Sequence, residues 1–144
     1  MAIDTPGKRR IVVGVDGSPN SAKALDWAVS FAHSGDTVIL LAAWSPIVVP
    51  AEMAMSYTFD DTGAKNVLED ENKRVAQKAA SRGVALAMHF ENNDPRNALL
   101  STAADVIVVG ARGHGGVMGL LLGSVADYVS RHSKVPVVIV PAGE

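Results

Sequence analysis

The chain has 144 residues, a hydrophobic fraction of 48% and a formal net charge of −2 at pH 7. This size and composition predict one compact globular domain and exclude a disordered or fibrous protein. The charge provides no overall field that attracts nucleic acid or an anionic membrane, so we expect neither as a partner. Cysteine is absent, which excludes disulfides and cysteine-ligated metal sites.

The first residues contain a basic cluster followed by a short apolar run. Residues 8–10, Lys-Arg-Arg, are interpreted as a solvated approach to a strand rather than a nucleic-acid patch. Asp16 interrupts the apolar run, which argues against a signal-peptide core, and no stretch reaches the roughly 18 apolar residues of a membrane-spanning helix. We therefore expect a cytoplasmic protein.

The first two predicted elements are a strand and a helix. Residues 10–18, RIVVGVDGS, are a β-branched apolar run ended by turn residues, which is typical of a central parallel strand covered on both faces. Ser18 is the predicted N-cap of the helix, and Pro19 takes its first position. One face of this helix is apolar and consists of Leu25, Ala28, Val29 and Ala32.

The middle of the chain predicts a strand, a loop, a helix and a further strand. Residues 37–44, TVILLAAW, are a second strand of the buried type. The irregular stretch 45–63 is predicted as a long loop, and residues 64–82 are rich in helix-forming residues. In residues 84–90, VALAMHF, larger apolar residues including Met88 alternate with smaller or polar ones. This pattern predicts a strand with one better buried face, as at a sheet edge.

The C-terminal third predicts two more strands and two helices. A short helix over about residues 94–104 begins with Asp-Pro, and residues 105–110, DVIVVG, follow as the fourth strand. Ser124, with Asp127 three residues later, resembles a capping box at the start of the last helix. Residues 135–140, VPVVIV, close the chain as a fifth strand.

The alternation of strands and helices predicts the fold class. It implies right-handed βαβ units and a parallel sheet with helices on both faces, a three-layer α/β/α domain. In such sheets ligands bind beyond the carboxyl ends of the strands. Three segments converge there: residues 14–18, residues 42–44, and the segment 110–129, which contains six glycines. These glycines either let the chain turn or clear space for an anion to approach backbone N–H groups.

The spacing of the glycines is more specific than their number. Neither the P-loop pattern G-x-x-x-x-G-K-[ST] nor the G-x-G-x-x-G pattern occurs. The chain has Gly110-x-x-Gly113-x9-Gly123-Ser124, together with VVGVDGS near its start and PVVIVP near its end. This combination resembles the universal stress protein family, specifically its ATP-binding branch, and the match spans nearly the whole chain.

The resemblance implies a fold and an assembly. The fold is a five-stranded parallel sheet of order 3-2-1-4-5, like that of the adenine nucleotide alpha hydrolases, in one domain over residues 1–144. The resemblance also implies a homodimer that pairs through the fifth strand, and an adenine nucleotide at the carboxyl edge of the sheet. The implied ligand is ATP, with AMP and cyclic AMP as alternatives and Mg²⁺ accompanying ATP.

The resemblance assigns binding roles to nine residues. Val15 and Asp16 match contacts to adenine and ribose, Ala43 matches a backbone contact to adenine, Gly110, Arg112 and Gly113 match the ribose and phosphate loop, and Gly123, Ser124 and Val125 match the phosphate-binding helix start. Elementary chemistry agrees, because N–H groups at a helix start form an anion site. Asp16 can accept hydrogen bonds from ribose hydroxyls or hold a phosphate-bound metal, and Arg112 can pair with a phosphate.

Three functional interpretations follow. The first is a homodimeric stress-response module that binds ATP, with its protein partner unknown. The second is a slow ATPase or phosphotransferase that uses the same site, although no water-activating base is evident. The third is a structural dimer with an empty site, which the intact glycine spacing argues against.

Two other features have competing interpretations. His114, Ser124 and Asp127 have the composition of a nucleophile triad, but no nucleophile elbow accompanies them, so no catalytic residue is assigned. The stretch 45–63 is either a lid over adenine or ordinary loop packing, and both remain open.

Overall fold

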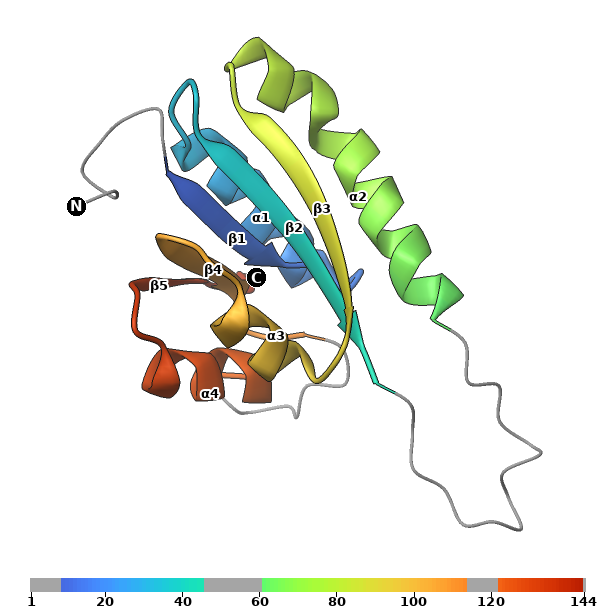
Figure 1. The fold of residues 1–144 in the computed structure, drawn as a ribbon, viewed down its shortest axis with the longest axis vertical. Coiled ribbons are helices and arrows are strands. Elements are labelled where there is room, and N and C mark those ends of the chain that lie inside the picture. The colour runs from blue at the N-terminus through green and yellow to red at the C-terminus, as the bar shows by residue number, and fades with distance from the viewer. Residues whose placement is uncertain (1–8, 46–60, 114–121, 144) are drawn as a thin grey trace, which may run out of the picture.

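Strands and helices alternate through the parts of the chain that the computed structural model describes, residues 9–45, 61–113 and 122–143. In chain order they are β1 (Arg10–Gly14), α1 (Pro19–Phe31), β2 (Thr37–Trp44), α2 (Thr62–Ser81), β3 (Ala85–Asn92), α3 (Pro95–Ser101), β4 (Val106–Gly110), α4 (Ser124–His132) and β5 (Val137–Val140). The strands form one parallel sheet of order β3-β2-β1-β4-β5 (Figure 1). The predicted topology is confirmed.

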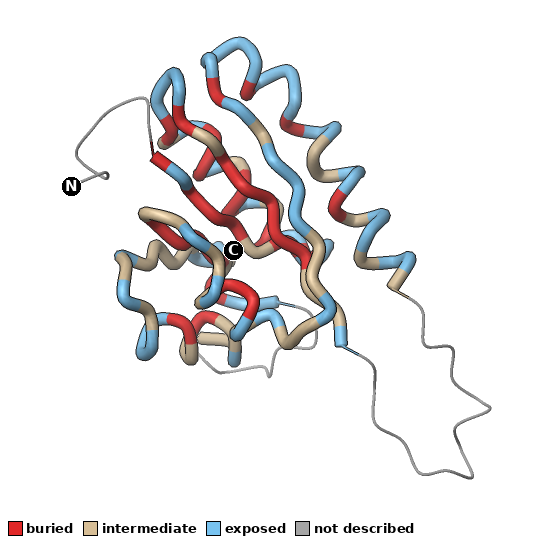
Figure 2. The backbone as a smooth tube through the Cα atoms, viewed as in Figure 1, coloured by how far each residue is buried: buried red, intermediate tan, exposed pale blue. Residues whose placement is uncertain are grey.

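Two helices cover each face of the sheet. Val13 of β1 and Leu40 of β2 pack with α1 and α2 in one hydrophobic cluster. Val12 and Ile39, their neighbours in the same strands, pack with α3 and α4 in the other cluster. Side chains alternate between the faces of a strand, so a strand covered on both faces reads as a continuous apolar run. Figure 2 shows that the buried residues are concentrated in the central strands and on the inner sides of the helices.

The start of α1 is as predicted. The Ser18 hydroxyl accepts a hydrogen bond from the Ser21 backbone N–H at 3.2 Å, and Pro19 takes the first helical position. The helix begins where it does because the cap satisfies an otherwise unpaired N–H and proline needs none. The apolar stripe including Leu25 and Ala28 is fully buried.

Arg9 of the basic cluster is not solvated as the sequence predicted, whereas Arg10, the first residue of β1, is exposed. Arg9 is only 6% exposed, and Asp36, with which it pairs, is fully buried. The Asp36 carboxylate accepts hydrogen bonds from the Arg9 backbone N–H at 3.0 Å and from the Arg9 guanidinium at 2.9 and 2.8 Å. Arg9 is buried because this carboxylate neutralises its charge at the turn that leads into β2.

Two predicted details of the remaining elements are wrong. Met88 was expected on the better buried face of β3 but is 50% exposed, although the predicted position of this strand at a sheet edge is confirmed. The helix α3 ends at Ser101 rather than near residue 104. At this end the Ser101 and Thr102 hydroxyls both donate to the Ala98 carbonyl. Within the described residues, no helix is both long and apolar enough to cross a bilayer.

Candidate functional site

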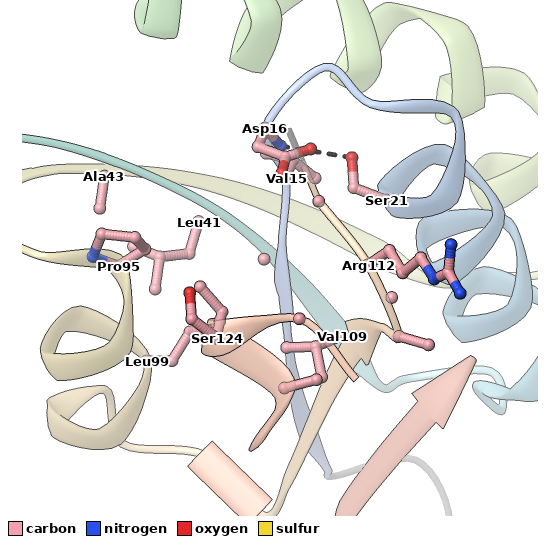
Figure 3. Close-up of a pocket in the computed structure, with 17 residues that line it drawn as sticks. Val15, Asp16, Ser21, Leu41, Ala43, Pro95, Leu99, Val109, Arg112 and Ser124 are labelled. Atoms are coloured by element: carbon pink, nitrogen blue, oxygen red, sulfur yellow. Dashed lines mark hydrogen bonds between the residues drawn. The ribbon is translucent and has the colours of Figure 1, made fainter. Parts of the chain in front are cut away.

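A pocket of about 470 Å³ lies at the carboxyl ends of the strands, within the size range of small-molecule sites. It is formed by the ends of β1, β2 and β4, by α3, and by the start of α4 (Figure 3). The structure brings all nine residues selected from the sequence to this one pocket: Val15, Asp16, Ala43, Gly110, Arg112, Gly113, Gly123, Ser124 and Val125.

One wall of the pocket is apolar and was not selected from the sequence. Leu41 from β2, Pro95 and Leu99 from α3, and Val109 from β4 form it. Sequence patterning assigns such residues to the core, and Leu99 is indeed only 1% exposed. A wall of this kind can receive the face of a flat, weakly polar ring.

Backbone hydrogen-bonding groups border the apolar wall where β1 ends. The Val15 N–H donates to the Leu41 carbonyl at 2.9 Å, one residue beyond the last residue of β1. Since alternate residues of a strand direct their backbone groups to the same side, Ala43 directs its N–H and C=O toward that side as well. The Trp44 carbonyl points the other way, toward β3, where it accepts from the Asn93 N–H at 3.0 Å. Ala43 thus presents a donor and an acceptor beyond the end of β1.

Asp16 lies at the mouth of the pocket and faces the loop after β4. Its Oδ1 accepts from the Ser18 N–H at 2.9 Å. Its own N–H donates to the Ser21 hydroxyl at 3.3 Å (Figure 3). A Cβ atom on Gly113 would lie 2.6 Å from Asp16 Oδ2, so only glycine fits at position 113 without moving this carboxylate. The arrangement places an exposed acceptor beside a backbone loop.

The N-terminus of α4 opens into the same pocket. Gly123 is the N-cap and carries no capping side chain, so the predicted capping box at Ser124 is wrong. The Gly123 N–H donates to the Ala111 carbonyl at 2.6 Å, which fixes the cap one residue earlier than the sequence suggested. Asp127 instead pairs with Arg131 at 3.1 Å. The first N–H groups of α4 carry partial positive charge and can bind an anion.

Arg112 presents its backbone, rather than its charge, to the pocket. Its N–H donates to Asn20 Oδ1 at 2.7 Å, and Figure 3 shows the guanidinium extending away from the pocket toward α1. Asn20 also explains the glycine at position 110, because a Cβ there would lie 2.8 Å from Asn20 Cγ. Sequence reasoning missed Asn20, since a single polar residue in the first turn of a helix gives no distinct signal.

Parts of the predicted site lie outside the described residues. These parts are His114 and residues 46–60 of the loop that was weighed as a lid. Within the part of the chain that the structure describes, no group of three or more His, Asp or Glu side chains gathers that could hold a metal ion. Asp16 is the carboxylate that lines the pocket, and it is the group that could contact a metal carried by a ligand.

Comparison with known proteins relates nearly the whole chain to one family. Residues 8–141 match the model of the universal stress protein family. The chain is 33% identical to the universal stress protein YxiE of Bacillus subtilis, with 91% of this chain and 97% of that protein covered. It is 32% identical to a universal stress protein of Mycobacterium tuberculosis over 91% of this chain, and it spans 47%, about half, of that longer relative.

A solved structure extends the comparison to the fold. A universal stress protein in complex with cAMP superposes with a TM-score of 0.67 at 30% sequence identity, and the match covers 95% of this chain and 99% of that chain.

Proposed function

Because this chain belongs to the universal stress protein family, we propose that it binds an adenine nucleotide, ATP in the first place, and acts as a homodimeric regulatory module in a stress response. The observation that carries this proposal is the composition of the pocket. An apolar wall beside a backbone donor and acceptor lies at one end, and the uncapped N-terminus of α4 lies at the other. These two ends suit a base and a phosphate respectively.

The proposed pose follows from the lining residues. Adenine lies against the wall that includes Leu41 and Leu99, and its edge pairs with the backbone groups of Ala43. The ribose hydroxyls donate to Asp16, and the phosphates lie between Gly113 and the first N–H groups of α4. Hydrogen bonds to charged phosphate oxygens are stronger than neutral ones, so this end supplies much of the affinity.

The number of phosphates is the finer part of the proposal. A related solved structure is a complex with cAMP, which supports an adenine nucleotide but not a particular phosphate chain. We propose ATP because the spacing from Gly110 to Ser124 resembles that of the ATP-binding branch of the family, and because the loop after β4 and the start of α4 both line the pocket. Mg²⁺ would accompany the phosphates, with Asp16 as the nearby carboxylate.

The proposed homodimer uses the edge of β5 that pairs with no other described strand. Pro136 and Val140 direct their carbonyls to β4, where they accept from Ile107 N–H at 3.0 Å and Ala111 N–H at 2.8 Å. By alternation, Val137 and Ile139 direct their backbone groups to the opposite edge. An unpaired strand edge invites pairing with a second strand. Antiparallel pairing of two copies of β5 about a twofold axis would satisfy these groups.

The test of nucleotide binding combines extraction and titration. The freshly purified protein is denatured, and released nucleotide is identified by mass spectrometry; nucleotide-free protein is then titrated with ATP, AMP and cAMP, each with and without Mg²⁺. GTP is titrated in the same way as a control. We expect adenine nucleotides to bind and GTP to bind at least about tenfold more weakly. Failure of every adenine nucleotide to bind the folded protein would overturn the proposal, and measured release of ADP at rates typical of enzymes would favour the ATPase alternative instead.

A further inference from the structure

Asn20 connects the end of β5, which the proposed function uses for dimer pairing, with the loop after β4, which it uses for nucleotide binding. Its side-chain amide donates to the Val140 carbonyl at 3.0 Å and to the Pro141 carbonyl at 3.3 Å, at the end of β5. Its Oδ1 accepts from the Arg112 N–H at 2.7 Å, in the loop that lines the pocket. We call these three hydrogen bonds the Asn20 link.

The Asn20 link continues through the backbone to α4. The Val140 carbonyl that accepts from Asn20 also accepts from the Ala111 N–H at 2.8 Å. The Ala111 carbonyl in turn accepts from the Gly123 N–H at 2.6 Å. One hydrogen-bonded path therefore joins the end of β5, the pocket loop and the N-terminus of α4.

The surroundings of Asn20 leave this link little freedom to move. Asn20 is only 6% exposed, and Gly110 packs so closely that a Cβ there would lie 2.8 Å from Asn20 Cγ. A buried amide that loses its partners pays a desolvation penalty, so a shift of either segment is opposed. Displacement at the pocket loop and displacement at the end of β5 are thus tied energetically.

We propose that Asn20 is a positioning residue that couples nucleotide occupancy of the pocket to pairing of protomers through β5. The inference rests on both parts of the proposed function. The loop arrangement held by Asn20 is the one that lines the pocket, and the same amide holds the end of β5, so each binding event favours the arrangement that the other requires. The coupling is therefore positive, and thermodynamic linkage makes it reciprocal.

The two ends of the amide allow the link to be cut selectively. In Asn20→Asp the carboxylate keeps an acceptor for the Arg112 N–H but cannot donate to the Val140 and Pro141 carbonyls. Position 20 lies in the first turn of α1, where a negative charge is favourable. Asn20→Ala, which removes both ends, serves as a second variant, so that a folding defect in one does not decide the result.

Lys23 provides a matched control on the same helix. Its Nζ donates to the Ala142 carbonyl at 2.7 Å, so it contacts the same C-terminal segment, but it does not line the pocket. Lys23→Ala removes a hydrogen bond to the segment after β5 without cutting the Asn20 link.

The experiment measures the dimer dissociation constant by sedimentation equilibrium, with and without saturating ATP and Mg²⁺. For the wild type we expect ATP to tighten the dimer by about fivefold or more. We call the dissociation constant without ATP divided by that with ATP the ratio. For Asn20→Asp and Asn20→Ala this ratio should fall to about one, and for Lys23→Ala it should stay at the wild-type value. Because each ratio is taken within one variant, a uniform change in affinity cancels. Melting without nucleotide identifies the variants that are folded.

The outcomes separate this inference from the function on which it rests. A wild type that binds ATP and dimerises with a ratio of one would overturn the coupling alone. A folded Asn20 variant that keeps the wild-type ratio would overturn the role of Asn20, as would loss of the ratio in Lys23→Ala. A wild type that binds no adenine nucleotide, or that stays monomeric, would overturn the proposed function itself.

Discussion

Gly110, Gly113 and Gly123 all line the pocket, yet each is glycine for a different reason. A Cβ at Gly110 would overlap Asn20, and a Cβ at Gly113 would lie 2.6 Å from the Asp16 carboxylate. At Gly123 the nearest atoms to such a Cβ lie 3.4 Å away, so the chain itself tolerates one. Gly123 therefore leaves space that a ligand, rather than the protein, would use.

We predict that Gly113→Val weakens ATP binding by about tenfold or more, because the new side chain displaces Asp16. Calorimetric titration of the folded variant measures the loss. Gly63→Ala is the matched control: nothing lies within 4 Å of a Cβ there, so ATP affinity should not change. Since alanine favours helix over glycine, the control should gain up to about 1 kcal/mol of unfolding free energy.

A double variant tests whether the effect of Gly113→Val acts through Asp16. If it does, adding Gly113→Val to Asp16→Ala should weaken ATP binding much less than it does in the wild type. Full additivity would show that the valine blocks the ligand directly. Unchanged ATP affinity in the folded Gly113→Val variant would contradict the placement of the nucleotide beside Asp16 and this loop.

The buried Arg9 and Asp36 pair governs stability rather than binding. Burial of the Asp36 carboxyl works to raise its pKa, but hydrogen bonds from the Arg9 side chain and from the His33 and Arg9 N–H groups lower it more. The pKa therefore lies below the ordinary value of 3.8. A lowered folded-state pKa contributes stability above the unfolded-state pKa, and this contribution is lost as the pH falls through the folded-state value.

We predict that Asp36→Ala lowers the unfolding free energy at pH 7 by about 3 to 5 kcal/mol, because it leaves Arg9 buried without its partner. Urea denaturation from pH 7 to about pH 3 should show that the penalty shrinks at acid pH, where the wild type loses the same interaction. Arg131→Ala, which breaks an exposed pair with Asp127, should cost at most about 1 kcal/mol. Equal penalties for the two variants would contradict this assignment.

At the scale of single elements, the starts of α1 and α4 differ: α1 has a side-chain cap, which stabilises the fold, and α4 has none. Ser18 caps α1 and is only 5% exposed. At α4 the cap is Gly123, which carries no side chain, and Ser124 is the first helical residue. The N-terminus of α1 is thus satisfied by its own chain, whereas the N-terminus of α4 faces the pocket.

We predict that one serine variant loses stability and the other loses ATP affinity. Ser18→Ala should lower the unfolding free energy by about 1 kcal/mol, because it removes a helix cap. Ser124→Ala should leave the melting temperature of nucleotide-free protein unchanged but weaken ATP binding by the equivalent of about 0.5–1.5 kcal/mol, the contribution of one hydrogen bond. Thermal melting and calorimetry measure the two effects. If Ser124→Ala lost as much stability as Ser18→Ala, Ser124 would act as a helix cap, contrary to the assignment of Gly123 as the N-cap of α4.

For the whole molecule, the two edges of the sheet differ. The outer strand β3 pairs with β2 along eight residues, whereas β5 has four residues and pairs with β4. Val137 and Ile139 pack toward α3 and α4, and Val138 and Val140 pack toward α1. Twofold antiparallel pairing of β5 about Val138 would place Val137 opposite the partner's Ile139.

We predict that Val138→Cys forms a covalent dimer on mild oxidation. In the proposed pairing the two copies of residue 138 are a non-hydrogen-bonded pair, with Cα atoms about 4.5 Å apart, within the span of a disulfide. The chain has no native cysteine, so the new thiol is unique. Non-reducing gel electrophoresis measures the product.

Val137→Cys is the control for this geometry. Its two copies would be offset by two residues along the strands, at roughly 8 Å between Cα atoms, beyond the reach of a disulfide. It should cross-link much less than Val138→Cys. Equal cross-linking of the two variants, or none in a protein that sediments as a dimer, would assign the dimer to another surface.

The sequence by itself determined the order of the elements and the place of the pocket. Apolar runs, an N-cap serine and glycine spacing are local signals, since each depends on residues that are neighbours in the chain. Parallel strands alternating with helices then place all carboxyl ends at one edge. For this reason the nine residues that the family resemblance assigned, which lie in three separate segments, line one pocket.

The tertiary structure alone decided which polar side chains are buried and which residues are their hydrogen-bond or ion-pair partners. Arg9 pairs with Asp36 across 27 positions of the chain, and Asn20 bonds Arg112 and Val140 across 92 and 120 positions. The apolar wall of the pocket has the same sequence signature as the core. The sequence could not predict these features because a contact between distant residues depends on how the elements pack, and local pattern carries no record of that packing.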